Sequence, residues 1–168
     1  MTIKDELARP FEQEDIEWRI QRAGMRNDKP WGIVVPYITS RAVMDRLDEV
    51  FGIDGWEDVY TFPTLNGDKL ETVVICTIKC KFITIEKNFI VVEKTDGAPL
   101  TNIESIKGGI SDAFKRAGVK WGIGRYLYRY NQTFWANFSA DGEHSVKIND
   151  RFYKWDAPAL PNLNKEGE

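Results

Sequence analysis

Residues 101–130 read TNIESIKGGISDAFKRAGVKWGIGRYLYRY, and this stretch decides the fold that we expect for the chain. Its apolar residues recur at helical spacing, which predicts an amphipathic helix capped by Thr101 or Asn102 and ended or kinked at Gly118. Gly108 and Gly109 each cost roughly 1 kcal/mol relative to alanine inside a helix, so we expect another backbone to approach their face. The positions expected to face the core are Ile103, Ile106, Ile110, Ala113, Phe114 and Ala117.

Positive charge is concentrated in the same stretch. Between Ser105 and Tyr130 six Lys or Arg residues accompany one acid, Asp112, for a net charge of +5. The whole chain carries −3, so the remainder carries −8. Cations that bind phosphates, beside rings that stack on bases, are typical of a single-strand nucleic-acid site. A core helix with a solvated basic face is the alternative that composition leaves open.

An antiparallel sheet is predicted before this helix, from strands at 56–65, 70–84 and 88–93. Turn signals separate these strands at Asn66-Gly67 and near Glu86-Lys87. In the middle strand apolar and polar residues alternate, with Cys76, Ile78, Cys80 and Phe82 on one face. The expected fold class is therefore α+β, an antiparallel β-meander packed on a long central helix in a β-β-β-α core.

Flanking elements complete the expected fold. The spacing of Ile16, Ile20 and Ala23 predicts a helix over 11–23, which leaves Trp18 off the stripe, packed under a loop or against a neighbouring subunit. We further expect a turn at 27–30, a strand at 32–38, and a second helix at 40–51 whose Arg46 lies on a solvated face. The region 134–138 is aromatic and irregular, and a C-terminal hairpin joins 145–148 to 151–155. These elements make one domain, 1–156, followed by a flexible polar tail, 157–168.

Several kinds of chemistry find little support in the sequence. Cys76 and Cys80 lie four residues apart on one strand, too far to bridge, and with a single histidine, His144, they suggest no metal site. The Gly122–Gly124 segment lacks the preceding strand of a dinucleotide fingerprint, and no phosphate-binding P-loop motif is present. We expect no cofactor and no catalytic residue, although a nuclease built from carboxylates and Mg²⁺ remains an alternative. With no signal peptide and no membrane segment, we expect a cytoplasmic protein without a membrane partner.

Two motifs in a fixed order resemble a known family. The run IKGGISDAFKRAGVKWGIGRYLY (106–128) follows FGIDGW (51–56), which itself follows Tyr37 and a helix. Together these motifs resemble the Rad52/Rad22 family of single-strand annealing proteins, chiefly its short phage and bacterial members. Asp54 stands where that family usually has asparagine.

The resemblance implies a set of DNA-binding residues. Lys115 and Arg116 match the family's adjacent Lys-Arg pair, which holds the backbone of a single strand, and Lys107 matches a basic position earlier in the same helix. Arg41 lies close to a basic position that follows the tyrosine. Charge and proximity add further cations, and three rings are candidates for base stacking. The added cations are Lys120, Arg125, Lys79 and Lys81, and the rings are Trp121, Tyr126 and Tyr128.

The function that this resemblance implies is ATP-independent binding of single-stranded DNA and annealing of complementary strands, in homologous recombination or double-strand break repair. The expected partners are single-stranded DNA, further copies of the chain in a ring, and a single-strand-binding protein, all in the cytoplasm of a bacterium or a phage host. The protein would not be an enzyme. Two alternatives stay open, a single-strand DNA- or RNA-binding module without annealing activity, and a metal-dependent nuclease.

Overall fold

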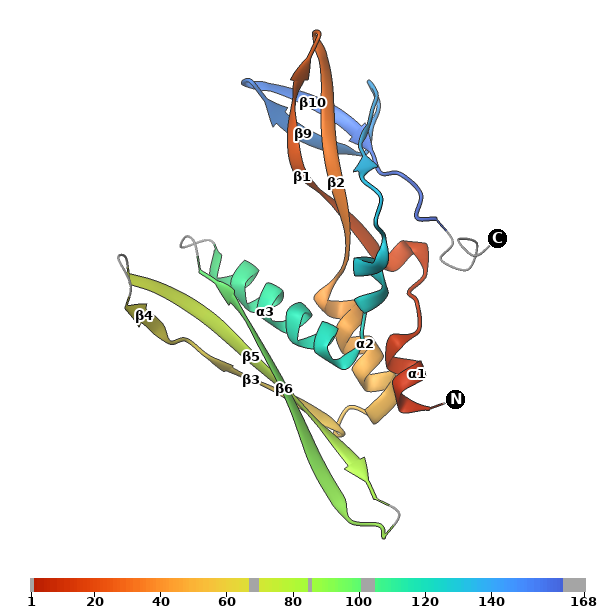
Figure 1. The fold of residues 1–168 in the computed structure, drawn as a ribbon, viewed down its shortest axis with the longest axis vertical. Coiled ribbons are helices and arrows are strands. Elements are labelled where there is room, and N and C mark those ends of the chain that lie inside the picture. The colour runs from red at the N-terminus through yellow and green to blue at the C-terminus, as the bar shows by residue number, and fades with distance from the viewer. Residues whose placement is uncertain (1, 67–69, 85, 101–104, 162–168) are drawn as a thin grey trace. The chain divides into compact units, whose positions relative to one another are not determined.

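The computed structural model describes residues 2–66, 70–84, 86–100 and 105–161, which form two compact units. Unit 1 comprises residues 1–11 and 38–129, and unit 2 comprises residues 12–37 and 130–168. The chain is a mixture of helices and antiparallel sheets, as Figure 1 shows, which confirms the predicted α+β class. No helix within the described ranges is long and apolar enough to cross a membrane.

The sheet of unit 1 is built around β5 (Leu70–Ile83), which pairs antiparallel with β6 (Phe89–Pro99) along its length. Its other partners are β3 (Trp56–Thr61) and β4 (Thr64–Asn66). The predicted meander is therefore confirmed, although the strand expected at 56–65 is two strands. Strand β6 extends to Pro99, beyond the end of the strand predicted at 88–93. The Asn66-Gly67 turn extends beyond the described residues.

The face of β5 that is buried carries Val74, Cys76, Ile78 and Cys80, each 0% exposed. Helix α3 (Ser105–Trp121) lies along this face, as Figure 1 shows. Phe114 packs against Trp56 with ring centroids 6.0 Å apart, and Trp121 stacks on Phe82 at 6.0 Å. Both thiols are free, as expected, and burial raises the pKa of Cys76 to about 11 and that of Cys80 to about 12.

The glycines of α3 pack differently from the prediction. A Cβ at Gly109 would lie 2.7 Å from the Leu100 side chain and 3.1 Å from that of Val74, so this glycine faces the sheet. Gly108 has open space around it. Gly118 does not end the helix, which continues to Trp121. A Cβ at this glycine would lie 2.9 Å from the Val43 side chain, so its small size lets α3 pack closely against α2 (Ser40–Phe51). Ala113, Phe114 and Ala117 are buried as predicted, Ile110 is half-buried, and Ile106 is half-exposed; the expected caps and Ile103 lie outside the described residues.

Helix α2 (Ser40–Phe51) has the predicted bounds. The Thr39 side chain accepts a hydrogen bond from the Ala42 amide, and Gly52 ends the helix at a φ of 77°. The prediction of a solvated Arg46 was wrong. Its side chain is 4% exposed and donates hydrogen bonds to the carbonyl oxygens of Glu6 and Arg9, at the end of α1 (Ile3–Ala8). Burial lowers the pKa of this guanidinium.

The described part of unit 2 contains two three-stranded sheets and a 3₁₀ helix, η1 (Gln13–Asp15). One sheet has the order β1 (Ile16–Arg26), β2 (Lys29–Ile38, whose last residue belongs to unit 1) and β7 (Phe134–Trp135). The other has the order β8 (Asn137–Phe138), β10 (Arg151–Asp156) and β9 (His144–Ile148). The C-terminal hairpin is confirmed, with Asn149 and Asp150 both at positive φ in its turn.

The helix predicted over 11–23 was wrong, because residues 16–26 are strand β1. Ile16, Trp18 and Ile20 alternate with exposed residues, a period of two that the spacing of Ile16, Ile20 and Ala23 concealed. Trp18 is 8% exposed and packs its ring on Phe134, with centroids 5.1 Å apart. This tryptophan is therefore part of the core of unit 2.

Candidate nucleic-acid interface

One row of polar side chains on α3 lies toward α2. Lys107, Ser111 and Lys115 are spaced four residues apart, so they share one side of the helix. The Ser111 hydroxyl lies 2.6 Å from that of Ser40, in the first turn of α2. Lys115 has its ammonium 3.0 Å from Asp112. Because helix N-termini carry partial positive charge, the start of α2 adds to the charge of this row.

Arg41 follows Ser40 in the same first turn and is exposed, as is Lys107. Neither side chain forms an ion pair with any residue in the described part of the chain. The structure thus brings Arg41 to the neighbourhood of the helix that carries Lys107 and Lys115. We call these three cations, with Ser40 and Ser111, the α2–α3 row.

A second pair of cations on α3 faces β6. The Arg116 Nε lies 3.3 Å from Asp96 Oδ1, and the Lys120 Nζ lies 3.7 Å from Asp96 Oδ2. Both cations are about half exposed. Burial by itself would raise the pKa of Asp96, but the Gly97 amide and the two cations outweigh it and hold this pKa below its usual value. The cluster has two positive charges for one negative charge, so it keeps a net charge of +1.

The C-terminal end of α3 uses other cations for its own carbonyl groups. Arg125 donates hydrogen bonds to the carbonyl oxygens of Val119 and Lys120, at 2.8 and 2.6 Å. Lys94 donates to the Lys120 carbonyl and sits 4.8 Å from the centre of the Trp121 ring. Arg125, which charge had made a DNA-binding candidate, therefore caps the helix.

Lys79 and Lys81 lie on the opposite side of the sheet from α3, because they alternate with the buried residues of β5. The Lys79 ammonium lies between Glu57 and Glu93, at 3.2 and 3.7 Å. Lys81 donates a hydrogen bond to the Asp54 carbonyl oxygen at 2.8 Å. The structure does not bring these two lysines together with the α3 cations.

The three candidate stacking rings are placed very differently. Trp121 and Tyr126 are each 8% exposed, and the Tyr126 hydroxyl accepts a hydrogen bond from the Phe11 amide. Tyr128 is 73% exposed, in the 3₁₀ helix η2 (Arg125–Arg129). Two of the rings therefore belong to the core, and Tyr128 is open to a ligand.

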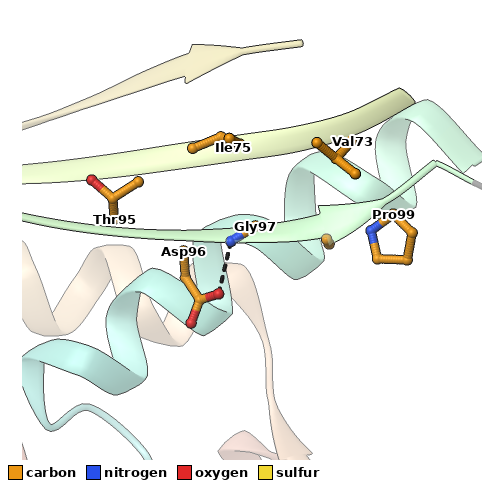
Figure 2. Close-up of a pocket in the computed structure, with 7 residues that line it drawn as sticks. Val73, Ile75, Thr95, Asp96, Gly97 and Pro99 are labelled. Atoms are coloured by element: carbon orange, nitrogen blue, oxygen red, sulfur yellow. Dashed lines mark hydrogen bonds between the residues drawn. The ribbon is translucent and has the colours of Figure 1, made fainter. Parts of the chain in front are cut away.

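Helix α3 packs directly on the sheet, through contacts of Gly109, Phe114 and Trp121. A hollow of about 370 Å³ lies along β5 and β6. Figure 2 shows its lining, with the Thr95 and Asp96 side chains on opposite sides of β6. Its lining side chains are mostly apolar, and Asp96 is its charged member. Within the described ranges, no group of three or more His, Cys, Asp or Glu residues is placed to hold a metal ion.

Sequence reasoning missed two features of this region. Asp96 lies beyond the strand predicted at 88–93 and was not among the candidates, although its carboxylate pairs with Arg116 and Lys120 from β6. Ser111 was not among the candidates either, although its hydroxyl joins α3 to α2 through Ser40. Both relationships link residues that are far apart in the chain. Arg116 lies 20 positions from Asp96, and Ser111 lies 71 positions from Ser40, so no local pattern marks either pair.

Comparison with known proteins agrees with the motifs. Residues 1–144 match the profile of the Rad52/22 family of double-strand break repair proteins. The chain is 27% identical over 156 residues to the single-stranded DNA-binding protein DdrA of Deinococcus radiodurans, covering 93% of this chain and 68% of the relative. It is 29% identical over 126 residues to the DdrA of Deinococcus deserti, covering 75% of this chain and 56% of that relative.

Proposed function

The chain belongs to the Rad52/22 family of double-strand break repair proteins, and on this premise we propose that it binds single-stranded DNA and anneals complementary strands without ATP. Two relatives named as single-stranded DNA-binding proteins support the choice of ligand. We further propose that it acts as a binding protein and not as an enzyme, in the cytoplasm. The matched region spans 68% of one relative and 56% of the other, so the proposal is limited to what this chain's own residues support.

The observation that carries the proposal is the α2–α3 row. Arg41 and Lys107 are exposed without an ion pair to a described residue, and Lys115 lies on the same side of α3 as Lys107. A strand that lays successive phosphates along this row would release counterions from several cations at once. Gly108 leaves open space next to Lys107, which allows a sugar-phosphate backbone to come close to the helix.

Arg116 and Lys120 would contribute a further phosphate contact. Their pairs with Asp96 are half exposed, and exposed ion pairs contribute only about 0–1 kcal/mol, so a phosphate can displace the carboxylate at small cost. In this proposal the phosphate replaces Asp96 as the partner of the two side chains. Tyr128 is the ring of unit 1 proposed to stack on a base.

Annealing follows physically from holding a strand by its phosphates. Bases that are not covered by protein stay free to test a second strand for complementarity. Several copies of the chain on one strand would raise the effective concentration of each contact, and we propose an oligomeric ring for this reason, with a single-strand-binding protein as a further partner. The support for the ring is the family membership. Trp18, which could have faced a neighbouring subunit, adds no support because it packs inside unit 2.

The test is the salt dependence of binding to a fluorescent oligo(dT). Arg41→Ala combined with Lys107→Ala should make the negative slope of log K against log salt shallower by about 1.4, since each neutralised phosphate of a single strand contributes about 0.7. Lys4→Ala is the matched control, an exposed lysine on the separate helix α1. An unchanged slope in the folded double variant would remove this row from the site. Binding that does not accelerate annealing would favour a plain single-strand-binding module.

A further inference from the structure

The β1–β2–β7 sheet of unit 2 also carries an exposed ring and exposed cations. In this sheet, Val34 pairs with Phe134 on the buried side, where Trp18 packs on Phe134. The neighbouring pair, Ile33 with Trp135, therefore lies on the other side of the sheet. Trp135 is 53% exposed there. Half of this tryptophan's surface is therefore open to solvent and offers a flat ring on which a base can stack.

Trp31 holds this exposed ring in place. It stands two residues before Ile33 in β2, and its ring lies 6.3 Å from that of Trp135 at an angle of 67°. The Trp31 ring also lies over β1, because a Cβ at Gly24 would be 3.0 Å from three of its atoms. The glycine gives the ring its room, and the edge-to-face contact gives Trp135 a rigid neighbour.

Unpaired cations follow the same hairpin. Arg22, Arg26 and Lys29 are exposed, and none of them forms an ion pair with any residue that the structure describes. Arg19 is a fourth cation of this hairpin, and its guanidinium lies 5.9 Å from the centre of the Tyr37 ring. Residues 19–31 contain these four cations and one acid, Asp28, for a net charge of +3. Unit 2 as a whole has more acids than bases, so the hairpin is a local exception.

We propose that this face is a second contact for single-stranded DNA, in which Trp135 stacks on a base and the hairpin cations bind the adjoining phosphates. The inference rests on the proposed function for its ligand. An exposed ring and exposed cations within one sheet match the composition of single-strand platforms, which bind every base through its flat face. The hairpin cations supply the salt-dependent part of this contact, and the ring supplies a part that does not depend on salt.

Deleting the base from the ligand tests the contact directly. Binding of wild type, Trp135→Ala and Trp135→Phe is measured with a labelled dT20 and with a strand of the same length made of abasic deoxyribose phosphates. Trp135→Ala should weaken dT20 binding about tenfold, with an unchanged salt slope, because one base stack is worth about 1–3 kcal/mol. The same variant should bind the abasic strand as wild type does, and Trp135→Phe should recover most of the loss on dT20.

Phe152→Ala is the matched control, since Phe152 is a ring of the same unit that is 74% exposed on β10. The inference is overturned if folded Trp135→Ala binds dT20 as tightly as wild type does, or if its affinity for the abasic strand falls by the same factor as its affinity for dT20. It is also overturned if light scattering shows that Trp135→Ala forms a smaller assembly than wild type, because Trp135 would then join subunits. In those cases the proposed function still stands if wild type binds dT20 and if this binding is weakened by Arg41→Ala with Lys107→Ala. A wild-type protein that binds neither strand overturns both.

Discussion

The hydroxyl oxygens of Ser40 and Ser111 lie 2.6 Å apart and join the first turn of α2 to the middle of α3. Through this hydrogen bond the start of α2, with Arg41, is held beside the side of α3 that carries Lys107 and Lys115. The two serines therefore position charges that belong to two different helices.

Replacing these serines should show that they act as a pair. A double-mutant cycle of Ser40→Ala and Ser111→Ala should give a coupling free energy of about 1 kcal/mol, the net value of a typical hydrogen bond. The measurement is the free energy of unfolding in urea for the four proteins. Strictly additive losses would mean that the hydroxyl groups do not interact in solution.

Asp96 should limit DNA affinity. Asp96→Asn keeps an oxygen for the Gly97 amide but frees Arg116 and Lys120 for phosphates, so oligo(dT) affinity at moderate salt should rise about threefold and the salt slope should steepen by about 0.7. Glu57→Gln is the control, because it removes a carboxylate that pairs with Lys79 on the other side of the sheet. Weaker binding by Asp96→Asn would mean that the carboxylate is needed to orient the cations in the complex.

The same carboxylate should affect stability at acid pH. The pKa of Asp96 in the folded protein is below its usual value. The stability that this carboxylate contributes is therefore complete above the pKa of the unfolded chain, and it is lost as pH falls through the lower folded value. The wild type should therefore lose more unfolding free energy than Asp96→Asn between about pH 5 and pH 2. Equal losses in urea titrations at these pH values would contradict the assigned pKa shift.

The buried thiols should make the fold sensitive to alkali. The pKa values of Cys76 and Cys80 rise to about 11 and about 12 in the folded protein, so above about pH 9 the unfolded chain releases protons that the folded chain retains. Stability should fall steeply with rising pH near pH 10, by at most roughly 2–3 kcal/mol per pH unit from the two thiols together. A thiol reagent should react with them at pH 8 only after unfolding, and rapid reaction in native buffer would contradict their burial.

The two adjacent glycines of α3 should respond in opposite directions to alanine. Gly108 has open space around it, so Gly108→Ala should stabilise the protein by up to about 1 kcal/mol through helix propensity. Gly109→Ala should destabilise it, because the new methyl group would lie 2.7 Å from Leu100. Thermal unfolding of both variants provides the comparison, and destabilisation by Gly108→Ala would mean that its surroundings are more crowded than the structure shows.

Elements encoded by a local pattern were predicted well from the sequence. Helix α2 has its cap at Thr39 and its stop at Gly52, and β5 has a long alternation, so each was found close to its bounds. Strand β1 was mistaken for a helix because Ile16, Ile20 and Ala23 also fit helical spacing. Only pairing with β2, a tertiary interaction, decides between the two periods.

The candidate site was predicted in part for the same physical reason. The cations of α3 could be found because charge and motif are local, whereas their partners come from other elements. Asp96 on β6, Ser40 on α2 and the carbonyl groups that engage Arg125 decide which cations stay available. Arg46 illustrates the limit, since a residue that looked solvated on a helix surface is buried against α1.

The most direct test of the central claim is annealing of two complementary labelled oligonucleotides, without ATP and with EDTA, by wild type and by a variant with Arg41→Ala, Lys107→Ala, Lys115→Ala and Arg116→Ala. We expect wild type to accelerate annealing, the Lys4→Ala control to match it, and the quadruple variant to lose most of the acceleration while remaining folded. Equal acceleration by wild type and the quadruple variant, or none by wild type, would contradict the claim that α2 and α3 hold the strand for annealing.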